Sequence, residues 1–272
     1  MFSKVAFIGA GSMAEAIIGG LAKDESLVKR ENIVVTNKLN EDRLEELQHK
    51  YGISTIVGKA AVVRDADIII LSMKPKDLAE AVEDIKNFVT EDQVIISVIA
   101  GASCDLIAGL FGKKVPVIRT MPNTSAMIGY SATALSKGEY ATEAQLKNAI
   151  ALFETVGSAF VVEEDEMHAV TSISGSGPAY FYFMVEAMEE AAKKVGLREE
   201  IAHNLIVQTI VGAGQMLKET TIDPGTLRKN ISSPGGTTQA GIETLATENF
   251  QEAVIACVQR AHDRSREMEE EN

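Results

Sequence analysis

Near its N-terminus the chain reads Val5-Ala6-Phe7-Ile8-Gly9-Ala10-Gly11-Ser12-Met13-Ala14, and this stretch decides the fold. Four apolar residues typical of a buried strand run into the pattern G-x-G-x-x-A, and a helical pattern follows through Leu21. In such a turn the first glycine permits the tight reversal, the second lets the backbone approach a pyrophosphate, and the alanine keeps the helix close to the sheet. The helix N-terminus then directs free N–H groups at the phosphates. The six residues from Gly9 to Ala14 are therefore predicted to bind a dinucleotide.

The surroundings of this turn strengthen a pattern that is weak when it stands alone. From Lys4 to about Glu163, short β-branched runs alternate with helical patterns, which indicates a parallel sheet with crossover helices. The predicted strands lie at residues 5–8, 33–36, 53–57, 67–71, 94–98, 115–119, 132–135 and 159–162. The central runs are nearly all apolar, as strands buried on both faces should be. We therefore expect an α/β fold with a Rossmann-type, NAD(P)-binding domain over residues 1–163.

Beyond residue 163 the pattern changes to helices, and no strand signal recurs. Long helices are predicted at residues 178–195, 198–219 and 249–270, with shorter ones at 165–173, 224–230 and 238–246. Residues 164–272 are thus expected to form an all-helical domain. The helix with Ile206, Val207, Ile210 and Val211 is apolar on more than one side. Either a partner chain covers it or it is the central helix of its domain, and the sequence leaves both interpretations open.

Composition and charge exclude several classes of partner. The formal net charge is −13 and no predicted helix carries a Lys/Arg stripe, so nucleic acid is not an expected partner. No apolar stretch approaches the ~20 residues that span a bilayer, and no signal-peptide pattern occurs, so no membrane partner is expected either. Cys104 and Cys257 are far apart, and none of the four His residues has metal-ligand spacing. A reduced, cytoplasmic protein without a metal site is the expectation.

The second predicted strand bears on the choice of dinucleotide. Its tip reads Thr36-Asn37-Lys38, where a site that prefers NAD usually carries an Asp or Glu that accepts from the adenosine ribose. Asn37 and Lys38 can instead donate to a 2′-phosphate, which favours NADPH, with NADH as a second cofactor. An ordinary solvated turn residue at Lys38 is the alternative.

Three further loops follow predicted strands, on the carboxyl edge where open α/β sheets bind ligands. They read Ser72-Met73-Lys74-Pro75, Ala100-Gly101-Ala102-Ser103 and Met121-Pro122-Asn123-Thr124. Small residues next to hydroxyl, amide and ammonium groups suit a nicotinamide pocket, so Ser72, Met73, Lys74, Pro75, Ala100 and Asn123 are assigned to the cofactor. Taken singly, each loop is also typical of an ordinary strand-to-helix turn.

Two glycine-rich loops precede predicted helices in the second half. They read Ser174-Gly175-Ser176-Gly177-Pro178 and Asn230-Ile231-Ser232-Ser233-Pro234-Gly235-Gly236-Thr237-Thr238. In the second, Gly-Gly before Thr-Thr exposes backbone N–H groups and two hydroxyls together, which makes a cradle for a small carboxylate. Plain N-capping of the helix explains the same residues equally well.

With these motifs in place, the chain resembles the pyrroline-5-carboxylate reductase family nearly from end to end. The resemblance depends on F-I-G-A-G-S-M-A at the start, S-M-K-P, R-T-M-P-N-T from Arg119, S-G-S-G-P-A-Y from Ser174 and above all S-S-P-G-G-T-T from Ser232. It implies NAD(P)H-dependent reduction of the C=N bond of 1-pyrroline-5-carboxylate to L-proline, the last step of proline synthesis. It also implies a helical domain that binds substrate and forms a homodimer or a ring of dimers.

The resemblance also assigns the substrate site. It places the substrate at Asn230, Ser233, Gly236, Thr237 and Thr238, with Glu164 at the edge, although the acidic run around Glu164 also suits the positive end of a helix dipole. Thr238 is the catalytic candidate and hydrogen-bonds the ring nitrogen. Because a hydroxyl of high pKa is a poor acid, we expect Thr238 to orient a substrate that is already protonated, or to act with a water relay. Many relatives carry Asn where this chain has Lys59, which leaves the adenosine contacts open and offers a second phosphate contact.

Two competing interpretations remain. β-Hydroxyacid dehydrogenases share the two-domain plan but use a Lys early in the helix after a glycine-rich turn, whereas the first Lys after Pro178 is Lys193, near the far end of that helix. A catalytically silent dinucleotide sensor on the same fold is the other, and the intact loop of residues 232–238 disfavours it.

Overall fold

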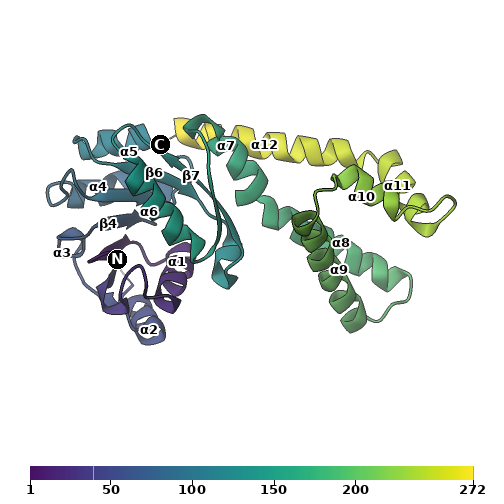
Figure 1. The fold of residues 1–272 in the computed structure, drawn as a ribbon, viewed down its shortest axis with the longest axis horizontal. Coiled ribbons are helices and arrows are strands. Elements are labelled where there is room, and N and C mark those ends of the chain that lie inside the picture. Colours follow the sequence, from purple (N-terminus) through teal and green to yellow (C-terminus); the bar gives the residue numbers. More distant parts are fainter. Residues whose placement is uncertain (39, 272) are drawn as a thin grey trace. The chain divides into compact units, whose positions relative to one another are not determined.

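The computed structural model describes residues 1–38 and 40–271. Asn272, the last residue of the predicted helical domain, lies outside the described residues. The chain divides into two compact units, Met1–Pro178 together with Ala261–Asn272, and Ala179–Arg260 (Figure 1). The last strand ends at Val161, and helices follow it in the described part of the chain. Residues 162–178 nevertheless belong to the same compact unit as the sheet. The domain boundary at residue 163 stays a prediction.

An eight-stranded sheet forms the frame of the first unit, in the order β3-β2-β1-β4-β5-β6-β7-β8. Its strands are β1 Val5–Ile8, β2 Ile33–Thr36, β3 Ser54–Thr55, β4 Ile68–Leu71, β5 Val94–Ser97, β6 Val117–Met121, β7 Ser131–Lys137 and β8 Gly157–Val161. Strands β1 to β6 are parallel. Because the chain crosses from β3 to the other side of β1, the strand order reverses there and leaves a crevice at the carboxyl ends, the usual ligand site of such sheets.

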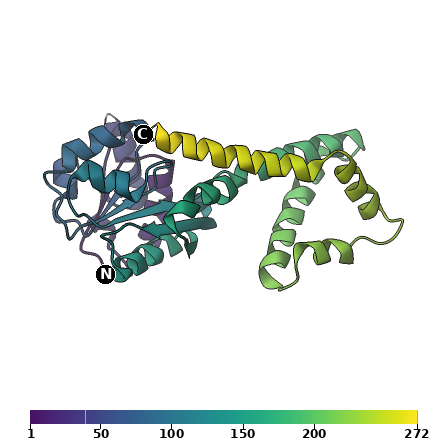
Figure 2. The same ribbon diagram turned by 90° about the horizontal axis from the view of Figure 1, so that it is seen from above.

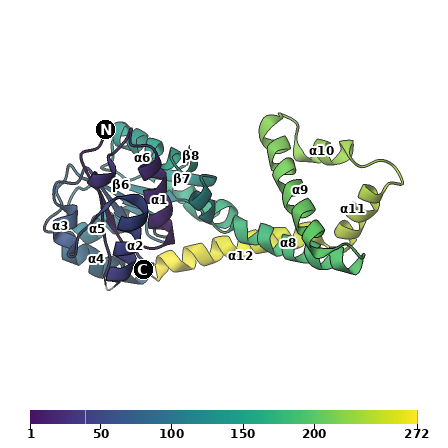
Figure 3. The ribbon, with the colours of Figure 1, turned by 90° about the horizontal axis from the view of Figure 1, so that it is seen from below.

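The end of the sheet departs from the expected all-parallel arrangement. Strand β7 runs antiparallel to β6, and β8 is parallel to β7, with α6 (Glu143–Glu154) between them in sequence (Figure 3). The connection of residues 122–130 holds only a 3₁₀ segment, η3 (Thr124–Ile128), and a parallel crossover needs a dozen or more residues. The chain therefore returns beside β6 in the opposite direction.

Helices cover both faces of the sheet. On one face α1 (Ser12–Lys23), α2 (Glu41–Tyr51) and α6 pack on the strand residues that point to that side, such as Phe7. On the other, α3 (Lys59–Val63), α4 (Leu78–Ile85) and α5 (Cys104–Phe111) pack on the alternate residues, such as Ile8 (Figure 1). Every residue of β1, β2, β4, β5 and β6 is buried. The predicted α/β fold is confirmed.

Helices follow β8 to the end of the described chain, as predicted. They are η4 Glu164–Glu166, α7 Met167–Val170, the π-helical turn η5 Thr171–Gly175, α8 Gly177–Lys194, α9 Glu199–Glu219, α10 Pro224–Asn230, α11 Thr237–Thr247 and α12 Phe250–Glu270, which is yellow in Figure 2. None of the helices in the described chain is both long and apolar enough to cross a bilayer.

The stretch predicted as one helix over residues 165–173 is instead broken into η4, α7 and η5. Hydroxyls bond back to the preceding turn there: Thr171 Oγ1 donates to the Met167 carbonyl at 2.7 Å and Ser174 Oγ to the Val170 carbonyl at 3.2 Å. Such bonds compete with the helical ladder, and a π turn results.

The helices of the second unit expose apolar side chains. In α9 only Ala202 and Ile206 are buried, whereas Leu205 is 56 % and Val211 51 % exposed. Exposed apolar residues also recur in α8 at Phe181, Tyr182, Phe183, Met184 and Met188. Because α9 is not buried within a single chain, the interpretation that a partner chain covers it is favoured over that of a central helix.

Substitution of Leu205 by Glu is expected to convert an oligomer into monomers, because an interface core excludes an unpaired charge. Light scattering coupled to size exclusion measures the mass. The matched control is Val57→Glu, which places the same charge on a residue of the first unit that is 75 % exposed and should keep the native mass. An unchanged mass for Leu205→Glu would show that this face is not the interface.

Candidate active site

The turn between β1 and α1 is fixed by the approach of two backbones. Gly9 has a φ of +116°, and a Cβ there would lie 2.8 Å from the carbonyl carbon and oxygen of Ser72, after β4. The Gly9 N–H donates to the Thr36 carbonyl at 3.0 Å, and the Ser72 N–H donates to the Ile8 carbonyl at 3.0 Å. The ends of β1, β2 and β4 are thereby held together at one edge of the sheet.

The N-terminus of α1 is open toward this edge. Its N-cap is Gly11, in extended conformation, and no side chain caps the helix. A Cβ on Gly11 would find no atom within 4 Å. The first N–H groups of α1 therefore face open space, with the positive end of the helix dipole behind them, and this is the arrangement that receives a pyrophosphate. Local geometry thus fits a dinucleotide.

A cleft of about 790 Å³ lies over the turn. Nine of the fourteen residues assigned to the cofactor line it: Gly9, Ala10, Gly11, Ser12, Asn37, Lys38, Ser72, Met73 and Lys74. The ionisable residues in its wall are five cations (Lys38, Arg43, Lys59, Lys74 and Lys76) against three acids (Glu15, Asp77 and Glu80). In a chain of formal charge −13 the cleft wall therefore carries a local excess of positive charge, which suits an anionic ligand.

The other five predicted cofactor residues do not line the cleft. Ala14 is fully buried in the core below α1, Met13 packs against the same core, and Pro75 begins the 3₁₀ segment η2 (Pro75–Asp77). Ala100 packs against the small apolar cluster that includes Met121. Ala14 therefore acts as the third residue of the pattern should, by letting the helix approach the sheet.

Asn123 joins the two loops that begin with Met121 and Ser174. Its Nδ2 donates to the Ser174 carbonyl at 3.1 Å, and its Oδ1 accepts from the Ser125 N–H at 3.1 Å. Gly175 lies next to Met121, since a Cβ there would be 3.5 Å from the Met121 sulfur. The two loops thus meet at the carboxyl end of β6, with the Asn123 amide engaged in holding them.

Sequence reasoning missed several residues of the cleft wall, among them Glu15 and Arg43. Arg43 Nε donates to the Ala10 carbonyl at 3.1 Å, and Arg43 also pairs with Glu15 and, at 2.6 Å, with Glu46. Glu15 further accepts from Lys50 Nζ at 2.8 Å and from the Tyr51 hydroxyl at 3.0 Å. No sequence signal marks them except their place in the first turns of α1 and α2.

The carboxyl group of Glu15 is held in its ionised form. Burial by itself raises the pKa of Glu15, but the hydrogen bonds from Lys50, Arg43 and Tyr51 outweigh it and lower the pKa to about 2. Because Arg43 bonds both Glu15 and the glycine-rich turn, this carboxylate fixes the position of a cation in the cleft wall.

The two lysines considered for a phosphate contact both carry an acidic partner from α4 or its end. Lys38 Nζ lies 2.5 Å from Glu80 Oε2, and Lys59 Nζ lies 2.7 Å from Asp84 Oδ2. The Asn37 side-chain oxygen accepts the Lys38 N–H at 2.6 Å. Both lysines line the cleft. The Lys38 side chain is 46 % exposed, so its contact with a phosphate stays a prediction.

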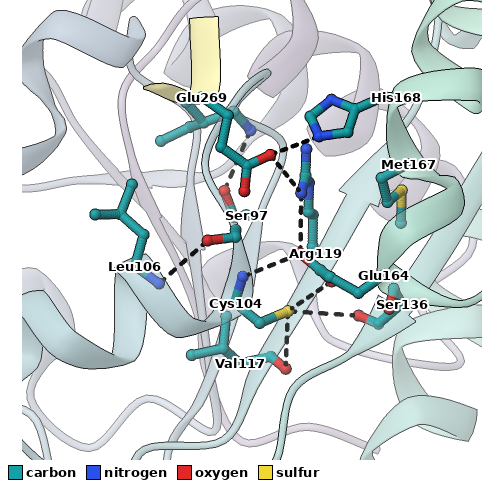
Figure 4. A network of polar contacts seen from close by, with 12 residues as sticks. Ser97, Cys104, Leu106, Val117, Arg119, Ser136, Glu164, Met167, His168 and Glu269 are labelled. Carbon is teal, nitrogen blue, oxygen red and sulfur yellow. Dashed lines mark hydrogen bonds and ion pairs between the residues drawn. The ribbon is translucent and has the colours of Figure 1, made fainter. Parts of the chain in front are cut away.

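Glu164 belongs to a partly buried polar network around Arg119 of β6 (Figure 4). Its Oε1 accepts from Arg119 Nη1 at 2.9 Å and from the N–H of Cys104, the first residue of α5, at 3.2 Å. Burial raises the pKa of Glu164, but the hydrogen bond and charge of Arg119 outweigh it, so the pKa is lowered. Burial also raises the pKa of the Cys104 thiol, which is therefore inert. Glu164 thus connects the N-terminus of α5 to Arg119 of β6, and its contact with substrate stays a prediction.

The loop before α11 is a tight turn. Gly235 has a φ of +71°, and the Gly236 N–H donates to the Ser233 carbonyl at 2.9 Å. A Cβ on Gly236 would be 3.0 Å from that carbonyl oxygen. The Gly235 N–H donates to Gln239 Oε1 at 2.8 Å. The two glycine N–H groups are therefore used within the turn and are not free for a ligand.

The donors that remain free belong to the threonines. The N-cap of α11 is Gly236, no side chain caps the helix, and neither Thr237 nor Thr238 donates its hydroxyl to another described residue. The N-capping alternative is therefore wrong. Two hydroxyl-bearing residues and the first N–H groups therefore lie in the first turn of an eleven-residue helix, while Asn230 ends α10 close by in sequence. This loop can bind a small carboxylate.

Two family models match the chain. A model described as pyrroline-5-carboxylate reductase dimerisation matches residues 164–268, and one described as NADP oxidoreductase, coenzyme F420-dependent, matches residues 4–101. Pyrroline-5-carboxylate reductase 2 of Bacillus subtilis is 47 % identical over 98 % of this chain and 96 % of its own length. The Methanosarcina acetivorans enzyme of the same name is 37 % identical over 97 % of each chain.

Solved structures agree with the sequences. A pyrroline-5-carboxylate reductase from Coxiella burnetii is 33 % identical, with a TM-score of 0.90 over 98 % of both chains. The Plasmodium falciparum pyrroline carboxylate reductase, solved with NADP bound, is 27 % identical, with a TM-score of 0.87 over 98 % of both chains. The open phosphate cradle, the helical second half and these likenesses along the whole chain lead to one conclusion: the chain belongs to the pyrroline-5-carboxylate reductase family, whose members are NAD(P)H-dependent oxidoreductases.

Proposed function

We propose that this reductase binds NADPH in the cleft over the β1–α1 turn and uses it to reduce 1-pyrroline-5-carboxylate, which the loop of residues 232–238 binds, to L-proline. The observation that carries the cofactor half is the uncapped N-terminus of α1, where Gly11 leaves the N–H groups uncovered in a cleft with an excess of cations. The two unpartnered threonine hydroxyls at the start of α11 carry the substrate half.

The chain's own residues bind and orient. The nicotinamide supplies the hydride for the ring carbon of the C=N bond. The helix N-terminus at Thr237, with Ser233 and Gly236 shaping the turn, holds the carboxylate of the substrate, and Asn230 closes the loop. The Thr238 hydroxyl accepts from the protonated ring nitrogen and thereby sets the angle of the ring. A hydroxyl is too weak an acid to supply that proton, so the substrate binds as the iminium or receives its proton through water.

The adenosine end of the cleft sets the preference for NADPH. Asn37, Lys38 and Lys59 supply donors and positive charge for a 2′-phosphate, and no acid follows β2 directly. NADH is the second cofactor, because the phosphate cradle at Gly11 serves both.

In this proposal the second unit forms a homodimer or a ring of dimers. Its exposed apolar side chains in α8 and α9 support the homodimer. We place the enzyme in the cytoplasm because both cysteines, Cys104 and Cys257, are free thiols.

Alanine substitutions at the two glycines of the turn separate folding from binding. Gly9→Ala should lower the free energy of unfolding by about 2 kcal/mol or more, because a side chain at positive φ meets the Ser72 backbone. Gly11→Ala should leave the melting temperature unchanged, since its Cβ meets no atom, yet weaken NADPH binding on the order of tenfold because the methyl group enters the cradle. Calorimetric unfolding and NADPH fluorescence titration measure the two. Full NADPH affinity in Gly11→Ala would exclude this turn as the pyrophosphate site.

Thr238→Ala should reduce kcat/KM for 1-pyrroline-5-carboxylate by about 10- to 100-fold, the effect of losing one hydrogen bond to a charged group. Thr238→Ser retains the hydroxyl and should retain most of the activity. The matched control is Thr244→Ala in the same helix, whose hydroxyl donates only to the Ala240 carbonyl, and its activity should be native. Native kcat/KM in Thr238→Ala, with NADPH still bound, would remove Thr238 from the site.

Glu164→Gln tests whether Glu164 contacts the substrate or only supports the fold. Arg119 is 1 % exposed and pairs with Glu164 at 2.9 Å and more distantly with Glu269 at 3.7 Å, so removing the nearer charge should cost about 2 kcal/mol of stability at neutral pH. Because the folded pKa of Glu164 is depressed, its contribution is present above the ordinary value of 4.5 and is lost as pH falls through the folded pKa, so the difference from wild type should shrink in acid. The exposed Glu154→Gln is the control. A raised KM at native stability would instead assign Glu164 to the substrate.

A further inference from the structure

An ion pair joins two elements of the cleft wall at its adenosine end. Lys38, directly after β2, and Glu80, in α4, lie 42 residues apart in the chain, and both line the cleft. Lys38 Nζ lies 2.5 Å from Glu80 Oε2, with the two side chains 46 % and 56 % exposed. The pair is therefore solvated and adjustable, and it holds the cation to which the proposed function assigns the 2′-phosphate of NADPH.

The Lys38–Glu80 pair brings an acid to the part of the cleft where the tip of β2 carries none. In a site that prefers NAD, a carboxylate at the tip of the second strand accepts from the ribose hydroxyls. The tip of β2 carries none here, but Glu80 in α4 brings a carboxylate to within hydrogen-bond distance of Lys38. The cleft thus contains both the cation that suits a 2′-phosphate and the acid that suits a 2′-hydroxyl.

We propose that Glu80 is a specificity-determining residue of this cleft, which competes with the 2′-phosphate of NADPH for Lys38 and accepts from the ribose hydroxyl of NADH. This inference rests on the proposed function. Lys38 favours NADPH over NADH. Glu80 weakens the binding of NADPH and strengthens that of NADH, so the difference between the two affinities becomes smaller and the chain uses both cofactors.

The neighbouring charges point to Lys38 as the cation that changes partner. Arg43 is committed to Glu15, to Glu46 and to the Ala10 carbonyl, so it is fixed. Lys59 pairs with Asp84 at 2.7 Å and is only 17 % exposed. The Lys38–Glu80 pair is exposed on both sides, and exposed pairs contribute little to stability, so a doubly charged phosphate can displace Glu80 readily.

The acids near Lys38 all raise its pKa. The hydrogen bond to Glu80 raises the pKa of Lys38, and the charges of Glu80, Asp77 and Asp84 add to this effect. Lys38 is therefore fully charged at neutral pH. The same three acids repel a phosphate, and Glu80 is the one in direct contact with Lys38.

The test compares Glu80→Gln with the wild type by calorimetric titration of four ligands: NADPH, NADH, adenosine 2′,5′-bisphosphate and 5′-AMP. The two ligands with a 2′-phosphate should bind about two- to fivefold more tightly to Glu80→Gln, and the two without it about two- to fivefold more weakly. Glu80→Asp should return both affinities toward wild type. A parallel shift of all four ligands, or no shift, would overturn the role of Glu80.

Two further variants locate the effect. Glu83→Gln removes the same charge from α4 at a residue outside the cleft lining, which pairs with Lys86 at 2.6 Å, and should leave all four affinities unchanged. In a Lys38→Gln background, Glu80→Gln should no longer tighten the bisphosphate by competition, and a full effect there would overturn the exchange of partners. A wild-type protein that binds none of the four ligands would overturn the proposed function. If the wild type binds them but Glu80→Gln does not shift the affinities for ligands with and without a 2′-phosphate in opposite directions, this inference alone is overturned.

Discussion

The contact of Gly9 with the backbone of Ser72 is the constraint on which the remainder of the site depends. Only a residue without a Cβ fits there, because the φ is +116° and the carbonyl carbon lies 2.8 Å from the Cβ position. The contact aligns the ends of β1 and β4, and it directs the next residues so that Gly11 is the N-cap of α1 and no side chain covers the first N–H groups of the helix. The phosphate cradle is thus a consequence of how tightly two buried strands are joined.

The carboxylate of Glu15 connects the glycine-rich turn and α1 to α2. Glu15 lies one turn into α1, its side chain is 9 % exposed, and three donors from α2 converge on it. With a pKa of about 2, Glu15 is ionised at neutral pH and gives Arg43 a charged partner. Arg43 in turn bonds the Ala10 carbonyl of the same glycine-rich turn. Helix, turn and cation therefore hold one another in position in the cleft wall.

The sequence predicted what depends on local pattern. Strands buried on both faces are continuous apolar runs, and glycine at position 9 marks the turn, so the sheet and nine cleft residues could be placed. The reversal of β7 was missed although the short connection after Met121 predicts it. Glu80 and Arg43 could not be found, because their roles come from pairings across the cleft that no spacing in the chain encodes. The threonines of residues 237 and 238 were recognised as a motif, but only the structure shows that Gly236 is the cap.

The net charge of this chain does not predict the charge of the ligand that its cleft suits. The chain has a formal charge of −13, yet the wall of its main cleft has more cations than acids. At physiological ionic strength charges are screened over about 8 Å, so a phosphate in the cleft responds mainly to the charged groups that line it. Within that range each lysine near the adenosine end is opposed by an acid of the α4 region, Glu80 or Asp84. The charge at this end of the cleft therefore depends on a few groups from segments far apart in sequence. Substitution of one acid can change that charge without any change in the sheet that carries the cleft.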